Sequence, residues 1–278
     1  MPRVRFASTV WLLATRAARI VAVTCMLIYA DGAEASTILY GVSTITNSVY
    51  TINTATGAAT FVTNTPTEVA TTGAEFLNGE LWVTDVIFGG YRTGTINLST
   101  GIFTPRIAQP GSTNNWQSLA ANESTDMFYT VDLGTNTLLS MTTTGMITPI
   151  GQTADIRGLA YDNLNGTLWG VNATTLFRIN TLSGATTPIG GLGPGVGTSL
   201  MGLAFADNTL FLTANNALYQ VSTSTGLATR IGANGVNGID GLAAFQPATN
   251  VPEPADTFAL LVLGTGSLVL VRRWWRHV

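Results

Sequence analysis

The hydrophobic and polar positions divide the chain into a long body and two ends. Between residues 36 and 250, apolar and polar side chains alternate in short runs such as VYTIN and LFRIN, and Gly, Asn and Asp separate the runs. This alternation predicts short β-strands joined by turns, and no part of the body shows a convincing helical period. At the ends the alternation stops: residues 20–30 and 258–271 are uncharged, mostly apolar stretches with arginines on one side.

A motif recurs five times in the body. Each copy has an apolar–polar alternation, then Asn, Ser or Thr, and then a closing Gly, as in LFRINTLSG. A Thr-rich run follows each copy, and alternating runs precede it. The closing glycines lie 44, 44, 39 and 42 residues apart, at Gly57, Gly101, Gly145, Gly184 and Gly226. Each unit therefore predicts four short strands, which is the content of one β-propeller blade.

The phase of the repeat predicts how the ring closes. The first unit begins at ILYGVS (38–43) and lacks the GLAxF-like run that opens the other units. One such run, GLAAF (241–245), stands alone after the last unit. We expect it to pair with 38–62 and complete one blade, which would remove two sheet edges. The predicted fold class is all-β: a single propeller of five four-stranded blades, closed by the C-terminal strand.

The body, over residues 38–245, resembles propellers of secreted bacterial proteins whose blades carry a LYxIDxxTG-like strand. The resemblance implies the architecture and leaves the activity open, because propellers host enzymes, binding proteins and scaffolds alike. One aromatic residue per unit occupies an equivalent position, and we expect these rings to fill the core between blades. They are Tyr40, Trp82, Tyr129, Trp169 and Phe211.

Residues 1–35 resemble a secretory signal peptide. Arginines at positions 3, 5, 16 and 19 form a positively charged N-terminal region, and the apolar residues 20–30 follow it. Ala33 and Ala35 then place small side chains at the two positions that signal peptidase recognises. We expect a signal helix that is removed before Ser36. The alternative is a buried helix or an uncleaved anchor, for which this stretch is short. The single cysteine, Cys25, lies in the apolar region, so the mature protein would contain no thiol or disulfide.

The C-terminal residues combine a proline-rich motif, an apolar segment and a basic end. The predicted body (36–247) is followed by a linker (248–257) that contains Val251, Pro252, Glu253 and Pro254. Residues 258–278 then predict a transmembrane sorting segment with a basic tail. The apolar stretch 258–271 becomes just long enough to span when residues 255–257 and the Trp274–Trp275 pair are added, and Arg272 and Arg273 are expected on the cytoplasmic side. This order resembles the PEP-CTERM sorting signal. The alternative is an ordinary C-terminal anchor with a chance Pro-Glu-Pro sequence.

The PEP-CTERM resemblance implies processing partners and a location. In that family a membrane-embedded exosortase recognises and cleaves the tail, in Gram-negative bacteria that make extracellular polysaccharide. We therefore expect signal peptidase and an exosortase-type enzyme as partners and a transient inner-membrane intermediate. The final location would be the periplasm, the cell surface or the extracellular matrix.

The composition of the body excludes several chemistries. The chain contains no Lys, and its one histidine, His277, lies in the tail, so a Ser-His-Asp triad, a Cys-His pair, a Schiff-base lysine and a His-ligated zinc site are unavailable. Five Arg and eleven acidic residues give residues 36–250 a net charge of −6, which disfavours nucleic acid as a partner. A Ca²⁺ site would need a dense Asp cluster, which is lacking, and we expect no metal or cofactor.

Carboxylates are the remaining catalytic side chains, and glycoside hydrolysis needs only two. The loops from the fourth strand of one blade to the first strand of the next should line one face of the ring. Weak ligand-face candidates in or beside these loops are Glu68, Trp116, Asp155, Arg157 and Asp240. No motif links them, so a role in turns or at the solvated surface is the main alternative for the acids. Trp116 could stack on a sugar or be buried against a neighbouring blade.

These observations lead to a functional hypothesis with two alternatives. We expect a non-enzymatic surface or extracellular-matrix protein that binds extracellular polysaccharide, or another surface protein, through the loop face. The first alternative is a carboxylate-dependent enzyme that cleaves glycans. The second is a passive structural protein without a ligand.

Overall fold

The alternating runs of the body form β-strands throughout. The structure is a computed structural model, and it describes residues 37–67, 69–87, 90–110, 115–197 and 202–246. Within these ranges lie twenty strands in five four-stranded antiparallel sheets. No helix in the described ranges is long and apolar enough to cross a membrane. The predicted signal peptide, linker and C-terminal segment fall outside the described residues.

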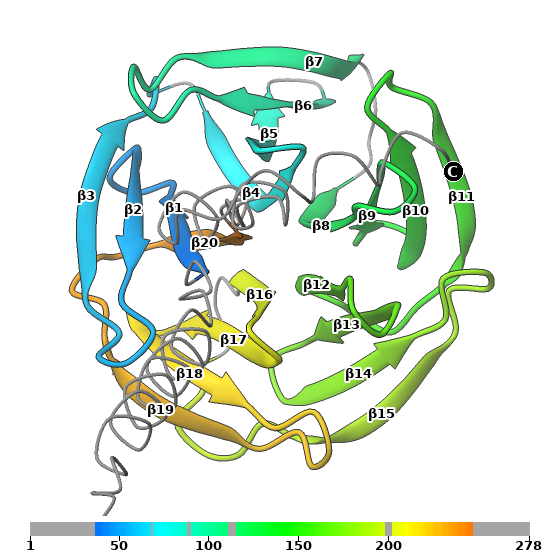
Figure 1. The fold of residues 1–278 in the computed structure, drawn as a ribbon. Coiled ribbons are helices and arrows are strands. Elements are labelled where there is room, and N and C mark those ends of the chain that lie inside the picture. Colours follow the sequence, from blue (N-terminus) through cyan, green and yellow to red (C-terminus); the bar gives the residue numbers. More distant parts are fainter. Residues whose placement is uncertain (1–36, 68, 88–89, 111–114, 198–201, 247–278) are drawn as a thin grey trace, which may run out of the picture. The chain divides into compact units, whose positions relative to one another are not determined.

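The sheets are arranged as blades around a centre, with the first strand of each blade innermost and the fourth on the rim (Figure 1). Blade I consists of β20 (Ile239–Phe245), β1 (Ile38–Ser43), β2 (Ser48–Ile52) and β3 (Ala59–Asn64). Blade II consists of β4 (Ala70–Leu77), β5 (Glu80–Ile87), β6 (Gly90–Ile96) and β7 (Phe103–Pro110). Blade III consists of β8 (Trp116–Asn122), β9 (Met127–Asp132), β10 (Thr137–Thr142) and β11 (Ile147–Gln152). Blade IV consists of β12 (Gly158–Asp162), β13 (Thr167–Val171), β14 (Thr175–Ile179) and β15 (Thr186–Gly191). Blade V consists of β16 (Gly202–Ala206), β17 (Thr209–Ala214), β18 (Ala217–Val221) and β19 (Ala228–Ala233).

The chain ends of the body meet in blade I. Strand β20 pairs with β1 in antiparallel register from Ile38 opposite Phe245 to Val42 opposite Gly241. The first unit of the repeat supplies three strands of this blade, and the unpaired last run supplies the innermost one. The prediction of a five-bladed propeller closed by its C-terminal strand is therefore confirmed. Closure places a partner beside every innermost strand and removes the open edges.

The core lies between neighbouring blades. The five repeated aromatic residues are all buried, with exposed fractions of 4–9%. Tyr40 of blade I contacts Phe76 of blade II, with ring centroids 5.2 Å apart, and Trp82 of blade II contacts Phe128 of blade III at 5.1 Å. Each of these two rings thus packs on the next blade. Burial of one large ring per blade supplies apolar area at every interface, as the repeat predicted.

The rim is also continuous from blade to blade. The backbone N–H of Ala59, at the start of β3, donates to Asn234, just after β19, at 3.2 Å. In the same way Ala228, at the start of β19, donates to Leu192, just after β15, at 3.0 Å. The fourth strands therefore follow one another end to end around the ring (Figure 1). The closing glycines of the repeat lie at these junctions.

Candidate functional site

The loops that connect blades lie on one face, together with the turns between second and third strands. The backbone N–H of Thr65, after β3, donates to Asn47 in the β1–β2 turn at 2.7 Å. Backbone hydrogen bonds join these two loop types in three other blades as well. There are two in blade III, one in blade IV and one in blade V, and they run from the N–H of Leu133 to Asn115, Thr153 to Asn136, Leu192 to Thr174 and Asn234 to Asn216. This assembled surface, the loop face, is where ligand-binding residues were expected.

Of the weak candidates that the structure describes, only Asp155 and Arg157 are joined to each other by an ion pair or hydrogen bond. Asp155 is half exposed and pairs with Arg157, with Oδ2 and Nη2 3.2 Å apart. Asp240 is buried at 6% exposure, and its Oδ2 accepts a hydrogen bond from the Thr44 hydroxyl at 2.5 Å. No group of three or more His, Cys, Asp or Glu side chains that could hold a metal occurs among the described residues. Glu68 lies outside the described residues.

Trp116 is the first residue of β8 and is completely buried. Its ring contacts Tyr91 of blade II, with centroids 5.8 Å apart. The indole therefore packs between blades II and III, which is the second of the two roles considered for it, and the ring is not exposed for stacking on a sugar. The indole nitrogen has no hydrogen-bond partner among the described residues.

Asp240 is an unusual carboxyl of the loop face. It precedes Gly241 on the innermost strand of blade I, and one oxygen, Oδ1, is buried without a hydrogen-bond partner among the described residues. Burial raises the pKa of Asp240 to about 6, and the hydrogen bond from Thr44 opposes this change. Such a group keeps its proton at mildly acidic pH, unlike an ordinary Asp.

A second buried carboxyl, Glu75, lies on β4 and breaks the repeat of the innermost strands. Opposite the repeated aromatic residue, the other four blades have alanine, whereas blade II has Glu75 opposite Trp82. Burial raises the pKa of Glu75 to about 8, and hydrogen bonds from the backbone of Phe76, Ala244 and Ala121 act in the opposite direction. These three donors belong to the innermost strands of blades II, I and III, so this carboxyl bridges the closing strand and its neighbours.

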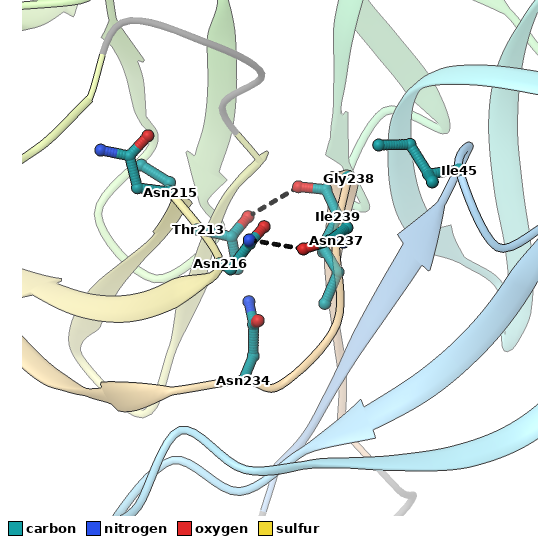
Figure 2. A pocket seen from close by; sticks show the side chains of 9 residues that line it. Ile45, Thr213, Asn215, Asn216, Asn234, Asn237, Gly238 and Ile239 are labelled. Atoms are coloured by element: carbon teal, nitrogen blue, oxygen red, sulfur yellow. Dashed lines mark hydrogen bonds between the residues drawn. The ribbon is translucent and has the colours of Figure 1, made fainter.

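The loop face contains a polar pocket at the junction of blades V and I, which we call the seam pocket (Figure 2). Its volume is about 260 Å³. The β17–β18 turn, the β19–β20 connection and the β1–β2 turn supply its lining. The lining residues are Ile45, Thr213, Ala214, Asn215, Asn216, Asn234, Asn237, Gly238 and Ile239. None of them is charged, and four are asparagines.

Local backbone conformation places the asparagines of the seam pocket. Asn215 and Asn216 form the two-residue turn between β17 and β18, with φ of 47° and 56°. Asparagine tolerates this left-handed region, which a tight hairpin turn requires. The Asn216 amide then donates to Oδ1 of Asn237 at 2.5 Å across the pocket (Figure 2). The backbone N–H of Asn234 donates to the carbonyl of Asn216 at 3.0 Å, which holds the two segments together.

These asparagines were not among the site residues predicted from the sequence. The signal was present in the segments TANNAL and GANGVNGID, which hold all four of them. Separately, each segment has the composition of an ordinary turn. Only the pairing of β20 with β1 brings the second segment beside the β1–β2 turn, where Thr44 donates to the carbonyl of Gly238 at 3.1 Å.

Comparisons with known proteins support the fold. No protein-family model matches the chain, and no curated protein is similar enough in sequence to count as a relative. A solved structure described as the nidogen/laminin complex matches with a TM-score of 0.54 and 10% identity, over 75% of this chain and 98% of that chain. A streptogramin B lyase matches with a TM-score of 0.43 and 17% identity, over 71% of this chain and 66% of that one. A glutaminyl cyclase from Myxococcus xanthus matches with a TM-score of 0.44 and 16% identity, over 72% and 77%. At 10% identity, the similarity to the first of these structures extends to the fold alone.

Proposed function

We propose that the protein is an exported surface or extracellular-matrix protein that binds extracellular polysaccharide through the loop face without cleaving it. The observation that carries the proposal is the seam pocket, an uncharged, amide-rich hollow on that face. Amide groups both donate and accept hydrogen bonds, as sugar hydroxyls do, so the chemistry is complementary. Of the candidate carboxylates, by contrast, Asp155 contacts Arg157 and Asp240 contacts Thr44.

The sequence of the two ends supplies the export part of the proposal. The signal peptide is removed before Ser36, and the segment 258–278 then halts in the inner membrane with Arg272 and Arg273 inside. An exosortase-type enzyme cleaves near Pro252-Glu253-Pro254, where two prolines disfavour helix and sheet and leave an extended chain. Mass spectrometry of the protein from an exosortase-positive host should find a new C-terminus near residue 254. A surface fraction that retains Trp274 and Trp275 would contradict this step.

Polysaccharide binding is tested with the purified full-length protein in mild detergent. It should be retained by gels containing extracellular polysaccharide from the producing cells, and the polymer should keep its length during incubation. No retention on any such polymer would overturn the binding proposal and would favour a passive structural protein.

A second candidate function is glycan cleavage with Asp240 as the general acid. The favouring observation is the pKa of Asp240, which burial raises to about 6, because a general acid must keep its proton near the working pH. If the protein shortens a polysaccharide and either Asp240→Asn or Asp155→Asn abolishes the shortening, the enzyme replaces the binding protein as the better description. Retention without shortening favours the binding protein.

A further inference from the structure

The seam pocket has unused hydrogen-bonding groups on several sides. Asn216 and Asn237 bond to each other through one nitrogen and one oxygen, and within the described residues neither Oδ1 of Asn216 nor Nδ2 of Asn237 makes another hydrogen bond. Asn234 is buried at 4% exposure, and its Oδ1 accepts the backbone N–H of Val236 at 3.2 Å, which leaves its amide nitrogen without a described partner. The residues lining the pocket therefore offer one acceptor and two donors that no described residue uses.

The second feature is the rigidity of the pocket wall. Backbone carbonyls of the β19–β20 connection and of the start of β20 accept hydrogen bonds from blades I and V. Ser43 Oγ donates to the carbonyl of Asn237 at 2.6 Å, and Thr213 Oγ1 donates to the carbonyl of Ile239 at 3.2 Å. Gly197 lies so close to the Asn215 amide that an added Cβ would overlap with it. The backbone of this wall is thus held in place before a ligand arrives, while the side chains of Asn215, Asn216 and Asn237 are exposed. A fixed backbone lowers the entropy lost on binding.

The third feature is the charge and size of the pocket. Its lining contains no ionisable side chain, and the closest acid in the sequence, Asp240, follows directly after Ile239. An anionic sugar would therefore lose water without gaining a cation. A volume of about 260 Å³ is below the range typical of drug-sized ligands, and it suits a single sugar ring. Ile45, which is 62% exposed at the pocket, offers an aliphatic contact for the C–H surface of that ring.

From these features we infer that the seam pocket is the subsite for one neutral sugar residue, with Asn216, Asn234 and Asn237 hydrogen-bonding its hydroxyls. The inference rests on the proposed function and narrows it to an uncharged hexose or N-acetylhexosamine unit. A pocket formed by both ends of the body also makes sugar binding dependent on ring closure, since β20 carries one wall and β1 leads into another.

The test uses the full-length protein in mild detergent and saturation-transfer NMR with glucose, galactose, mannose, N-acetylglucosamine and glucuronate. At least one neutral sugar should bind, and glucuronate should not. The variant Asn216→Gly keeps the left-handed turn but removes the amide, and we expect at least a tenfold loss of affinity. Asn237→Ala should give a similar loss.

The matched control is Asn208→Gly. Asn208 has a φ of 57° in the two-residue turn at the other end of β17, outside the seam pocket, and its replacement should leave affinity unchanged. Melting temperatures of all three variants establish that they are folded. If Asn216→Gly melts far below the parent, Asn237→Ala carries the test, because its backbone need not change.

Each outcome decides between the two proposals. Unchanged affinity in folded Asn216→Gly and Asn237→Ala would overturn the assignment of the pocket, as would binding of glucuronate alone. If no sugar in the panel binds but polysaccharide retention persists, the subsite is wrong and the proposed function stands. If a neutral sugar binds through the asparagines but no polysaccharide is retained, the subsite stands and the polymer-binding function fails.

Discussion

On the rim of the propeller the structurally important residues repeat from blade to blade, whereas on the loop face most of the notable residues do not. On the rim, the closing glycine of each motif touches the fourth strand of the preceding blade, and the partner in three blades is another glycine. A Cβ added at Gly184 would lie 2.5 Å from the carbonyl oxygen of Gly151, and Gly57 with Gly232 and Gly226 with Gly190 are equivalent pairs. The repeated residue is thus explained by close backbone contact between blades.

On the loop face, most of the informative residues do not repeat. Asp240, Arg157, Asn234 and Asn237 each occur in one blade or at one junction. Asn216 is the exception, because Asn47 and Asn136 take the equivalent turn position with positive φ in blades I and III. Glu75 follows the same rule on an innermost strand, where the other blades have alanine. The comparison indicates that repeated positions build the ring and that departures from the repeat locate candidate chemistry. The following predictions test this division.

Removal of the closing strand should have the largest effect. Deleting residues 239–246 leaves the inner edge of β1 unpaired and removes Ile239 and Leu242, which are 5% and 1% exposed, from the core. We expect loss of cooperative thermal unfolding and aggregation by light scattering. A variant that lacks only the C-terminal residues 258–278 serves as the control. A soluble deletion variant with a sharp melting transition would contradict closure by β20.

Glu75 should make the free energy of unfolding depend on pH. Its pKa is about 8 in the folded protein and near 4.5 when unfolded, so folding disfavours the ionised form. Its contribution to stability is therefore highest below about pH 4.5 and falls as the pH rises to about 8. Relative to Glu75→Gln, the parent should lose a few kcal/mol between these limits, measured by urea denaturation.

The exposed Glu80 provides the control for this measurement. Its side chain is 49% exposed and pairs with Arg106 at 3.2 Å, so Glu80→Gln should leave the pH profile of the parent almost unchanged. Parallel profiles for the parent and Glu75→Gln would show that the carboxyl at position 75 titrates normally.

Gly190 and Gly191 are neighbours on β15, and only Gly190 is in close contact with the next blade. Replacing each by alanine therefore distinguishes the cost of crowding between blades from the general effect of replacing a glycine. A Cβ at Gly190 would overlap with the carbonyl oxygen of Thr225 in the next blade, whereas a Cβ at Gly191 would lie 3.7 Å from the carbonyl oxygen of Thr174, an ordinary contact. Gly190→Ala should lower the free energy of unfolding by about 2 kcal/mol. Gly191→Ala should change it by less than about 0.5 kcal/mol, or raise it slightly. Equal effects in chemical denaturation would rule out the contact between blades as the reason for Gly190.

The ion pair of the loop face should contribute least to stability. Asp155 and Arg157 are 50% and 42% exposed, so solvent screens their attraction. In a double-mutant cycle with Asp155→Ala and Arg157→Ala, the coupling energy should be below about 1 kcal/mol. A coupling energy of several kcal/mol would show instead that this ion pair contributes substantially to the stability of the propeller.

The sequence by itself determined the number of blades, the strands of each blade and the strand that closes the ring. Those features depend on period-2 alternation and on a repeated phase, which are local properties that can be read along the chain. The burial of the five aromatic residues followed for the same reason, since an equivalent position in each blade meets an equivalent neighbour.

Only the tertiary structure decided which side chains meet. Trp116 stands in the sequence beside turn residues, yet it is buried, because Tyr91 of the preceding blade covers it. In the sequence Glu75 is one of eleven acidic residues of the body, and only the backbone of blades I and III around it distinguishes it from the others. The seam pocket combines residues near 45, 215 and 237. Pairing of β20 with β1 within blade I brings residues near 237 beside residues near 45, and the hydrogen bond from Asn234 to Asn216 joins this segment to the β17–β18 turn. Contacts of this kind depend on the register between blades, which a single sequence does not encode in any local pattern.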